Sequence, residues 1–253
     1  MITTKSKQEL DLMRHAGKIL AETFEILQEA IHPGVDTRHL DQLAYDYIIS
    51  KNATPSFKNY NGFPGSICAS PNEMVVHGIP SRQVKLSEGD IISLDVGVCY
   101  CGYHADAART FPVGSVSPEA TRLIEVTRQS FFEGICKARA GNRLGDLSHA
   151  VQAYVESHGY SVVRDLVGHG IGAHLHESPD VPNFGNPGRG IRFVPGMTIA
   201  VEPMVNAGDF AVRVLKDGWS VVTKDGSLSA HYENTIIITE DEPEITTIGD
   251  GTC

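Results

Sequence analysis

Four acidic residues at strand-like positions carry the strongest chemical signal in this sequence. Asp95 ends an apolar segment, and Asp106, Glu202 and Glu233 lie at comparable places in later segments. Alternate side chains of a strand share a face, so Asp95 projects away from the apolar residues on either side of it. A carboxylate buried in a sheet is costly unless it is paired or coordinated, and Arg109 is the nearest cation. The four acids therefore favour a site for two divalent cations over four strand ends that reach solvent.

An imidazole ligand for such a site is available in residues 168–177, GHGIGAHLHE. Glycines on both sides of His169 let the backbone approach a neighbour closely, and His174 and His176 follow. A GHG sequence by itself more often marks a core or turn histidine. Next to the acids, one of these histidines becomes a ligand candidate and another a group that orients ligands or transfers protons. Oxygen ligands with one imidazole suit Mn, Fe(II), Co or Zn.

The segments that must position these groups occur twice. At one constant offset along the chain, Phe24 corresponds to Phe131, Gly34 to Gly141 and Leu40 to Leu147, and positions 84–95 overlie 191–202. Asp95 thereby maps on Glu202. At a somewhat larger offset, positions 104–106 match 231–233, which maps Asp106 on Glu233. Chance similarity of two amphipathic segments is the alternative, but agreement across helix, turn, strand and acid favours a repeated architecture.

Each repeat starts with two amphipathic helices and continues with strands. Residues 13–31 are apolar at helical spacing, and this helix should end near Pro33, because proline disfavours a helical predecessor. The corresponding helix of the second repeat begins at Ser117-Pro118, a capping residue followed by proline. Shorter helices are predicted at 40–48 and 147–155, and the strands after them have hairpin-like connections. The sequence therefore predicts a pseudo-symmetric α/β domain with a mostly antiparallel sheet.

The overall composition excludes several classes of protein. The chain has 253 residues, enough for one large domain or two modest ones. Its formal charge of −10 argues against nucleic acid or an anionic membrane as the main partner. The first residues show no signal peptide, and no apolar run approaches the length of a membrane span. Five cysteines without a CxxC pair indicate reduced thiols in a cytosolic protein.

Seven motifs make the sequence resemble a known enzyme family almost from end to end. They are NEMVVHGIP (72–80), LDVG (94–97), GYHADAARTFPVG (102–114), GHGIG (168–172), HESPDVPNFG (176–185), VEPMVNAG (201–208) and SLSAHYENT (227–235). Together they resemble the type I methionine aminopeptidase family in its short bacterial form. The resemblance implies the pita-bread fold, an α/β fold whose curved, mostly antiparallel sheet carries helices on its outer face. It also implies one catalytic domain over 1–253, with pseudo-two-fold halves of about 1–115 and 116–253.

The resemblance further implies a centre of two divalent metal ions. Its five ligands are Asp95, Asp106, His169, Glu202 and Glu233. By this match Asp106 and Glu233 bridge the two ions. The other three ligands divide between the ions, with Asp95 chiefly on one and His169 and Glu202 on the other.

Catalytic roles follow from the same resemblance for His77, His176 and Glu202. The ions lower the pKa of a bridging water, and Glu202 shuttles its proton. His176 faces the tetrahedral intermediate and stabilises its oxyanion. His77 lies near the scissile amide and holds the backbone nitrogen of the following residue.

Motif position also predicts an apolar, sulfur-tolerant pocket for the methionine side chain. Its candidate residues, each with an alternative as an ordinary core residue, are Tyr60, Phe63, Cys68, Leu175, Met204 and Trp219. His77 and His176 complete the substrate-binding set. Two positions depart from the family pattern, since Phe57 stands where a small or sulfur-bearing residue is common and Leu175 where an aromatic is common. His174 falls between motifs and is interpreted as structural or solvent-facing.

The implied activity is removal of the N-terminal methionine from nascent polypeptides when the next residue is small. The resemblance places such an enzyme in the cytoplasm, at or near the ribosome, as a monomer without direct nucleic-acid or membrane contact. Prolidase and aminopeptidase P share the fold and are the alternative peptidases, although they usually carry an additional N-terminal domain. A non-catalytic binding module of the same fold is the other alternative, and the five filled ligand positions argue against it.

Overall fold

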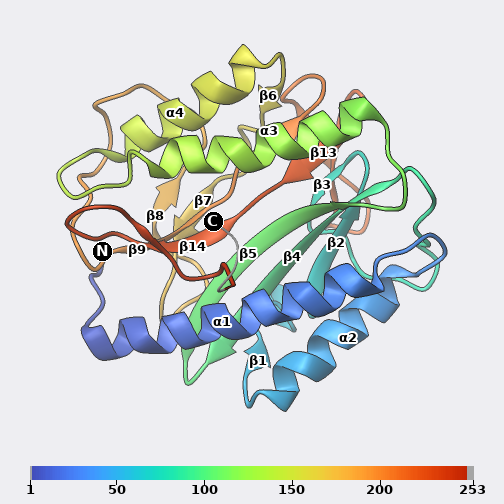
Figure 1. Ribbon diagram of the computed structural model, residues 1–253, viewed down its shortest axis with the longest axis horizontal. Helices are drawn as coiled ribbons and strands as arrows, with labels where there is room; N and C mark the ends of the chain where they lie inside the picture. The colour runs from blue at the N-terminus through green and yellow to red at the C-terminus, as the bar shows by residue number, and fades with distance from the viewer. Residues whose placement is uncertain (1, 250–253) are drawn as a thin grey trace.

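The computed structural model describes residues 2–249, in which four helices pack on antiparallel strands (Figure 1). Helices α1 (Lys7–Ala30) and α2 (Thr37–Ser50) lie along one side of the strands, and α3 (Pro118–Ile135) and α4 (Leu144–Ser157) lie along the other. The bounds of α4 follow those of α2 at the same offset that relates Leu40 to Leu147. The two helix pairs that the repeat predicted are therefore confirmed.

The helix ends follow from local sequence signals. The side chain of Ser6 accepts a hydrogen bond from the backbone N–H of Glu9, and the Glu9 carboxylate accepts one from the N–H of Ser6. This capping box starts α1, and the helix ends at Ala30, ahead of Pro33, as predicted. Ser117 caps α3 with its side chain, and Pro118 occupies the first turn, also as predicted.

The strands form four small sheets with antiparallel pairing throughout the described residues. One sheet holds β1 (Thr54–Pro55), β2 (Ile67–Pro71), β4 (Ile91–Tyr100) and β5 (Tyr103–Pro112). A second holds β7 (Gly168–Gly170), β8 (Glu177–Val181), β9 (Thr198–Val201), β14 (Asn234–Ile237) and β15 (Glu244–Ile245). The third combines β6 (Ser161–Val162), β10 (Met204–Asn206) and β13 (Ser229–His231). The fourth combines β3 (Met74–Val76), β11 (Val212–Val214) and β12 (Val221–Thr223).

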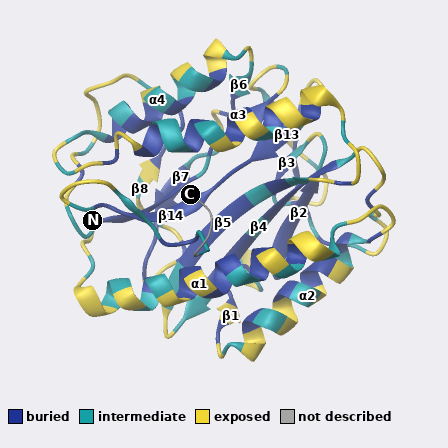
Figure 2. Ribbon diagram, viewed as in Figure 1, coloured by how far each residue is buried: buried dark blue, intermediate teal, exposed yellow. Residues whose placement is uncertain are grey.

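Alternation along the central strands separates two hydrophobic cores. Ile92, Leu94 and Val96 of β4 belong to the core under α1 and α2, as the parity of the sequence predicted. Ile91 points the other way and joins the core that α3 and α4 form with β9 and β14. Figure 2 shows the strands buried at the centre of the molecule and the exposed residues on the outward faces of the helices.

Matching contacts repeat in the two halves. An isolated β-bridge joins Asp36 to Lys85 in the first half, and another joins Arg143 to Arg192 in the second. The offset that relates the two helix pairs also converts the first bridge into the second. The pseudo-two-fold relation therefore includes long-range contacts as well as the helices.

The halves join along a seam where β5 runs beside residues 233–235. The N–H of Asp106 donates to Thr235 Oγ1, which donates to the carbonyl of Asp106, both at 2.9 Å. Ala108 and Glu233 exchange two backbone hydrogen bonds of 2.9 and 3.3 Å. The larger offset, which maps Asp106 on Glu233, also maps Ala108 on Thr235 and so converts the first pair into the second. The seam therefore lies on the pseudo-two-fold axis, and it brings Asp106 beside Glu233.

Within residues 2–249, every helix is too short or too polar to cross a membrane. Cys68, Cys99, Cys101 and Cys136 are free thiols, as predicted, and Cys253 lies outside the described residues.

Candidate metal centre and substrate pocket

The five predicted ligands converge on one cavity of about 250 Å³. Its lining includes all of them, namely Asp95, Asp106, His169, Glu202 and Glu233. β4 and β5 supply the two aspartates and β7 supplies the histidine, whereas Glu202 directly follows β9 and Glu233 directly precedes β14. Residues from both halves of the chain thus meet at the seam.

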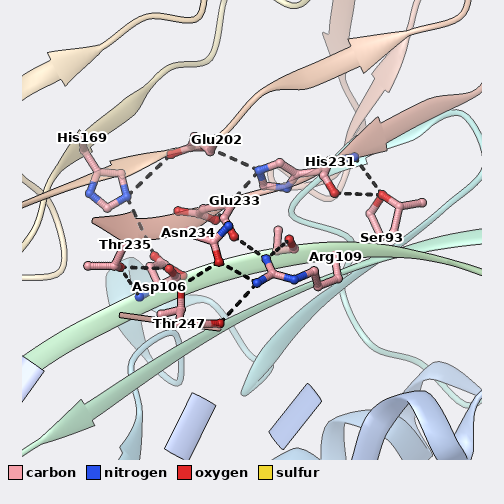
Figure 3. A network of polar contacts seen from close by, with 12 residues as sticks. Ser93, Asp106, Arg109, His169, Glu202, His231, Glu233, Asn234, Thr235 and Thr247 are labelled. Atoms are coloured by element: carbon pink, nitrogen blue, oxygen red, sulfur yellow. Dashed lines mark hydrogen bonds and ion pairs between the residues drawn. The ribbon is translucent and has the colours of Figure 1, made fainter. Parts of the chain in front are cut away.

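Ligand atoms in this group lie at separations that a cation can span. His169 Nε2 is 3.8 Å from Asp106 Oδ2 and 3.7 Å from Glu202 Oε1 (Figure 3). Asp106, His169 and Glu233 offer ligand atoms that all lie within 4.8 Å of one another. The two His169 distances, 3.7 and 3.8 Å, exceed the range of a hydrogen bond. Two ligands on one cation, each about 2.0–2.2 Å from it, can be this far apart.

Buried oxygens of the group are left without partners. Asp95 Oδ1, Asp106 Oδ1 and Glu233 Oε1 are buried and accept no hydrogen bond from any residue of 2–249. Leaving a buried carboxylate unpaired is costly. Divalent cations satisfy such oxygens, so the residues present fit the metal centre that the sequence predicted.

The titration behaviour of the group has the same origin. Burial raises the pKa of Asp95 to about 7. Burial first, and the neighbouring carboxylates second, raise the pKa of Asp106, Glu202 and Glu233 well above their ordinary values. Burial lowers the pKa of His169 to about 3. A neutral imidazole surrounded by mutually repelling carboxylates favours the binding of positive charge.

His231 belongs to the same group, although it was not among the predicted site residues. Its Nε2 is buried without a hydrogen-bonding partner in the described chain, 3.7 Å from Glu202 Oε2 and 3.9 Å from Glu233 Oε2. Glu202, His231 and Glu233 therefore form a second candidate ligand group. The sequence repeat could have pointed to His231, because it makes His231 correspond to His104. Its position next to Glu202 depends on the tertiary structure.

Arg109 binds the backbone and side chains next to the candidate ligand Glu233. Its guanidinium donates to the carbonyl of Glu233, to Asn234 Oδ1 and to the carbonyl of Thr247 (Figure 3). The guanidinium also lies over the ring of Tyr232, 4.4 Å from its centroid. A partly buried cation from the first half thus fixes the backbone that carries a carboxylate of the second half.

The glycines around His169 have the role that the sequence assigned to them. A Cβ atom on Gly168 would collide with the carbonyl of Ala200, and one on Gly170 would collide with the carbonyl of Ser178. The bare backbone lets β7 lie close between β8 and β9. The His169 Nδ1 lies 2.9 Å from the carbonyl of Gly170, so Nε2 is the nitrogen directed to the acids.

The cavity extends from the acids into an apolar region. Tyr60, Phe63, Cys68, Leu175 and Trp219, five of the candidates for the methionine pocket, line it. The rings of Phe63 and Trp219 pack edge to face with centroids 5.2 Å apart. Burial first, and the charge of Asp95 next, raise the pKa of the Cys68 thiol, which makes it a neutral, apolar part of the wall.

Other pocket residues differ in their placement. Met204 does not line this cavity but an adjoining one, which also contacts His77 and Glu202. Phe57 lines the apolar region, and a Cβ atom on Gly97 would lie 2.7 Å from its ring. The glycine of the LDVG motif therefore makes room for Phe57. Asn61, which was not predicted, is a further lining residue.

The remaining predicted histidines lie at the rim of the acids. His176 Nδ1 is 2.9 Å from Tyr60 Oη, and the His176 ring packs edge to face on His169 at 4.2 Å. His77 lines the cavity with φ of 58°, a conformation rare for residues other than glycine and frequent at functional sites. His174 is exposed and lies outside the cavity, in agreement with the solvent-facing interpretation.

Comparisons with known proteins agree with this architecture. The metallopeptidase family M24 matches residues 11–240. The methionine aminopeptidase of Clostridium acetobutylicum is 57% identical over 248 residues, which cover 98% of this chain and 99% of the relative. This chain belongs to metallopeptidase family M24 and to its methionine aminopeptidases. It is therefore a metal-dependent peptidase, and the resemblance stated from the motifs is confirmed.

Solved structures give the same result for the fold. The crystal structure of methionine aminopeptidase from Rickettsia prowazekii has a TM-score of 0.96 and 44% identity, with 98% of this chain and 100% of that chain covered. The pita-bread fold is thereby confirmed. The Xaa-Pro dipeptidase from Bacillus anthracis has a TM-score of 0.79 at 23% identity, and the match covers only 63% of that longer chain. The dipeptidase shares the fold alone.

Proposed function

We propose that this protein removes the N-terminal methionine from polypeptides whose second residue is small. Two divalent cations would be held by Asp95, Asp106, His169, Glu202 and Glu233 within a single catalytic domain made of both halves. The observation that carries the proposal is the set of buried, unpartnered carboxylate oxygens at one end of an apolar cavity. The names of the methionine aminopeptidases that this chain is similar to support the same substrate.

Bound cations would supply Lewis-acid activation of a water nucleophile at neutral pH. Glu202 would take up the proton that this water loses and return it to the leaving amine. The hydroxyl of Tyr60 would donate to His176 Nδ1, which leaves the imidazole proton on Nε2. That proton would then stabilise the oxyanion of the tetrahedral intermediate. His77 would hold the backbone nitrogen of the second residue.

The apolar region would bind the methionine side chain. Phe63 and Trp219 give it flat walls, and sulfur packs favourably against aromatic rings. Cys68 lies opposite Asp95 in the register of β2 and β4. Negative charge at Asp95 would therefore be close to the free amine of a bound methionine, which limits cleavage to the first residue.

We also infer that the protein works as a monomer in the cytoplasm, on nascent chains at or near the ribosome. Co, Mn, Fe(II) and Zn all suit the ligand set. Prolidase-like activity is disfavoured, because this chain is 57% identical to a methionine aminopeptidase and only 23% identical to the dipeptidase that shares the fold. A non-catalytic binding module would not need this many buried ligand atoms.

Replacing Glu202 by Gln tests the proton transfer. We expect hydrolysis of Met-Gly-Met to fall by about 10²–10⁴-fold, with an unchanged circular dichroism spectrum. Glu240→Gln is the matched control, because Glu240 is exposed. Full activity of Glu202→Gln with metal bound would exclude this role for Glu202.

Substrate and metal dependence test the remainder of the proposal. Peptides that begin with methionine should be cleaved when the second residue is small and not when it is large. Dipeptides with a residue other than methionine before proline should not be cleaved. Chelation should abolish turnover, and titration with Mn(II), Co(II), Fe(II) or Zn(II) should restore it. Preference for X-Pro peptides, or an active chelated enzyme, would overturn the assignment.

A further inference from the structure

The N-terminal segment before α1 reaches the loop that presents His176 to the cavity. We infer that Lys5 is a positioning residue, which holds this loop through an ion pair with Glu177. The inference rests on the role of His176 in the proposed function. It assigns a role to Lys5, which lies far along the chain from His176.

Lys5 and Glu177 form a nearly buried ion pair. Lys5 Nζ is 2.7 Å from Glu177 Oε2, and their side chains are only 6% and 14% exposed. Lys5 Nζ also donates to Thr3 Oγ1 at 2.7 Å, and Thr3 Oγ1 donates to the same Glu177 oxygen at 3.2 Å. Glu177 therefore has partners on its outer side that come entirely from the N-terminal segment.

The other oxygen of Glu177 holds the loop itself. Glu177 Oε1 accepts a hydrogen bond from the backbone N–H of His174 at 3.1 Å. The Lys5 side chain crosses the backbone at Gly172, where a Cβ atom would collide with Lys5 Cε. Glu177 directly follows His176 and begins β8. The ion pair thus closes the loop from residue 172 to 177 at both ends.

The segment that carries Lys5 is itself anchored. The backbone N–H of Lys5 donates to the carbonyl of Gly196 at 2.8 Å. The capping box of Ser6 and Glu9 starts α1 immediately afterwards, and Tyr103 Oη donates to Glu9 Oε1 at 2.5 Å. Lys5 is therefore presented to Glu177 from a fixed backbone, so little freedom remains to be lost when the pair forms.

His176 has few contacts of its own to define its place. Its ring touches Tyr60 at one nitrogen and packs edge to face with His169. A donor that stabilises an oxyanion must be placed within a few tenths of an ångström, and a displacement of about 1 Å can cost about 100-fold in rate. Removing one partner of a buried ion pair leaves the other charge uncompensated. Loss of Lys5 should therefore loosen the loop and displace the imidazole.

The test compares Lys5→Met with Lys7→Met in the metal-loaded full-length enzyme. Lys7 is exposed at the start of α1, and its replacement changes the net charge equally. With Met-Gly-Met as substrate, Lys5→Met should lower kcat about tenfold and leave KM within about twofold, whereas Lys7→Met should change neither. Lys5→Arg should restore most of kcat, because it restores the charge and the donors.

A readout without turnover keeps the inference separate from the proposed function. The enzyme is labelled with 15N-histidine, and the His176 imidazole signal is identified from its loss in His176→Gln. In metal-free protein, Lys5→Met and Glu177→Gln should both shift this signal, and Lys7→Met should not. If Lys5→Met leaves the His176 signal unshifted and has the same kcat as Lys7→Met, Lys5 does not position His176. An inactive parent enzyme would overturn the proposed function, while the NMR comparison would still decide whether Lys5 places His176.

Discussion

The two halves build their share of the metal centre from differently shaped strands. In the first half, β4 and β5 are unbroken strands of ten residues that carry Asp95 and Asp106. In the second half the corresponding hairpin is interrupted, because β9 stops before Glu202-Pro203 and β14 begins after Glu233. The pairs Val201–Asn234 and Met204–His231 nevertheless keep one register across the interruption.

This difference shows how the two halves of a repeat can carry different side chains while the strand register is kept. Proline has no N–H to donate to a strand ladder, and the glutamates lie at the interruption that Pro203 accompanies. The continuous hairpin fixes short aspartate side chains, while the interrupted one places longer glutamates. The second half also supplies the imidazoles of His169, His176 and His231. The first half therefore contributes continuous strands with two aspartates, and the second contributes two glutamates and most of the histidines around the cavity.

Conservative replacement of the two seam carboxylates gives the largest expected effect. Asp106→Asn and Glu233→Gln should each lower Mn(II) affinity and kcat/KM at least about 100-fold, since even residues that only support a ligand cost about 10–100-fold. Isothermal titration with Mn(II) and hydrolysis of Met-Gly-Met measure the two effects. Equal losses would mean that the halves contribute equally at the seam. Normal affinity in either variant would contradict the proposal that this residue is a metal ligand.

Arg109→Met should destabilise the metal-free protein by about 3 kcal/mol. The substitution removes three hydrogen bonds from a charged donor, to Glu233, Asn234 and Thr247. The Glu233 carbonyl and Asn234 Oδ1 keep a second donor in the Ala108 N–H and the Thr247 hydroxyl, whereas the Thr247 carbonyl is left unpaired, which costs about 1–3 kcal/mol. Urea unfolding measures the change. Arg128→Met is the control, because Arg128 is exposed and should change stability by less than about 0.5 kcal/mol. Equal stability of the two variants would show that the seam does not depend on Arg109.

The pH dependence of metal-free protein should report the carboxylates directly. Their pKa values are raised in the folded state, to about 7 for Asp95, so the folded state binds more protons than the unfolded state. The free energy of unfolding should therefore fall as pH rises above about 7, where the carboxyl groups of the unfolded chain are already ionised, by up to about 1.4 kcal/mol per pH unit for each proton that the folded state retains. The histidines near the centre are mostly neutral in both states over this window. Urea titrations with and without Mn(II) measure the slope, which bound metal should remove; a flat metal-free profile would contradict the prediction.

A comparison of equivalent helix starts gives the smallest effect. Asp36 caps α2 with a side-chain bond of 2.9 Å to the N–H of His39. Arg143 holds the same place before α4, where the described structure shows no capping bond from its side chain. Asp36→Ala should cost about 1 kcal/mol, and Arg143→Ala should cost clearly less. Thermal unfolding distinguishes the two, and equal costs would show that the cap is not what differs between these helices.

Local pattern predicted much of the fold and the site. Helical spacing predicted α1 and its end before Pro33, although the helix starts at Lys7 and so before the predicted span of 13–31. The capping residue Ser117 and Pro118 predicted the start of α3; both signals act within a few residues. Strand parity assigned Ile92, Leu94 and Val96 to the core under α1 and α2 for the same reason. The motifs named the acids and most of the apolar residues that line one cavity in the structure. They did not show that Met204 lies in an adjoining cavity, because a motif position does not define which wall a side chain faces.

The sequence by itself determined the repeat, the helix ends, the faces of the central strands and the residue types of a metal centre. These properties depend on neighbours within one helix or strand. Only the tertiary structure decided that His231 lies beside Glu202 and that Lys5 pairs with Glu177. Both contacts join segments far apart in the chain, and their partners are selected by how the two halves pack. The spacing of residues along the chain does not predict these partners. They pair because the folded chain brings their buried charged or polar groups together.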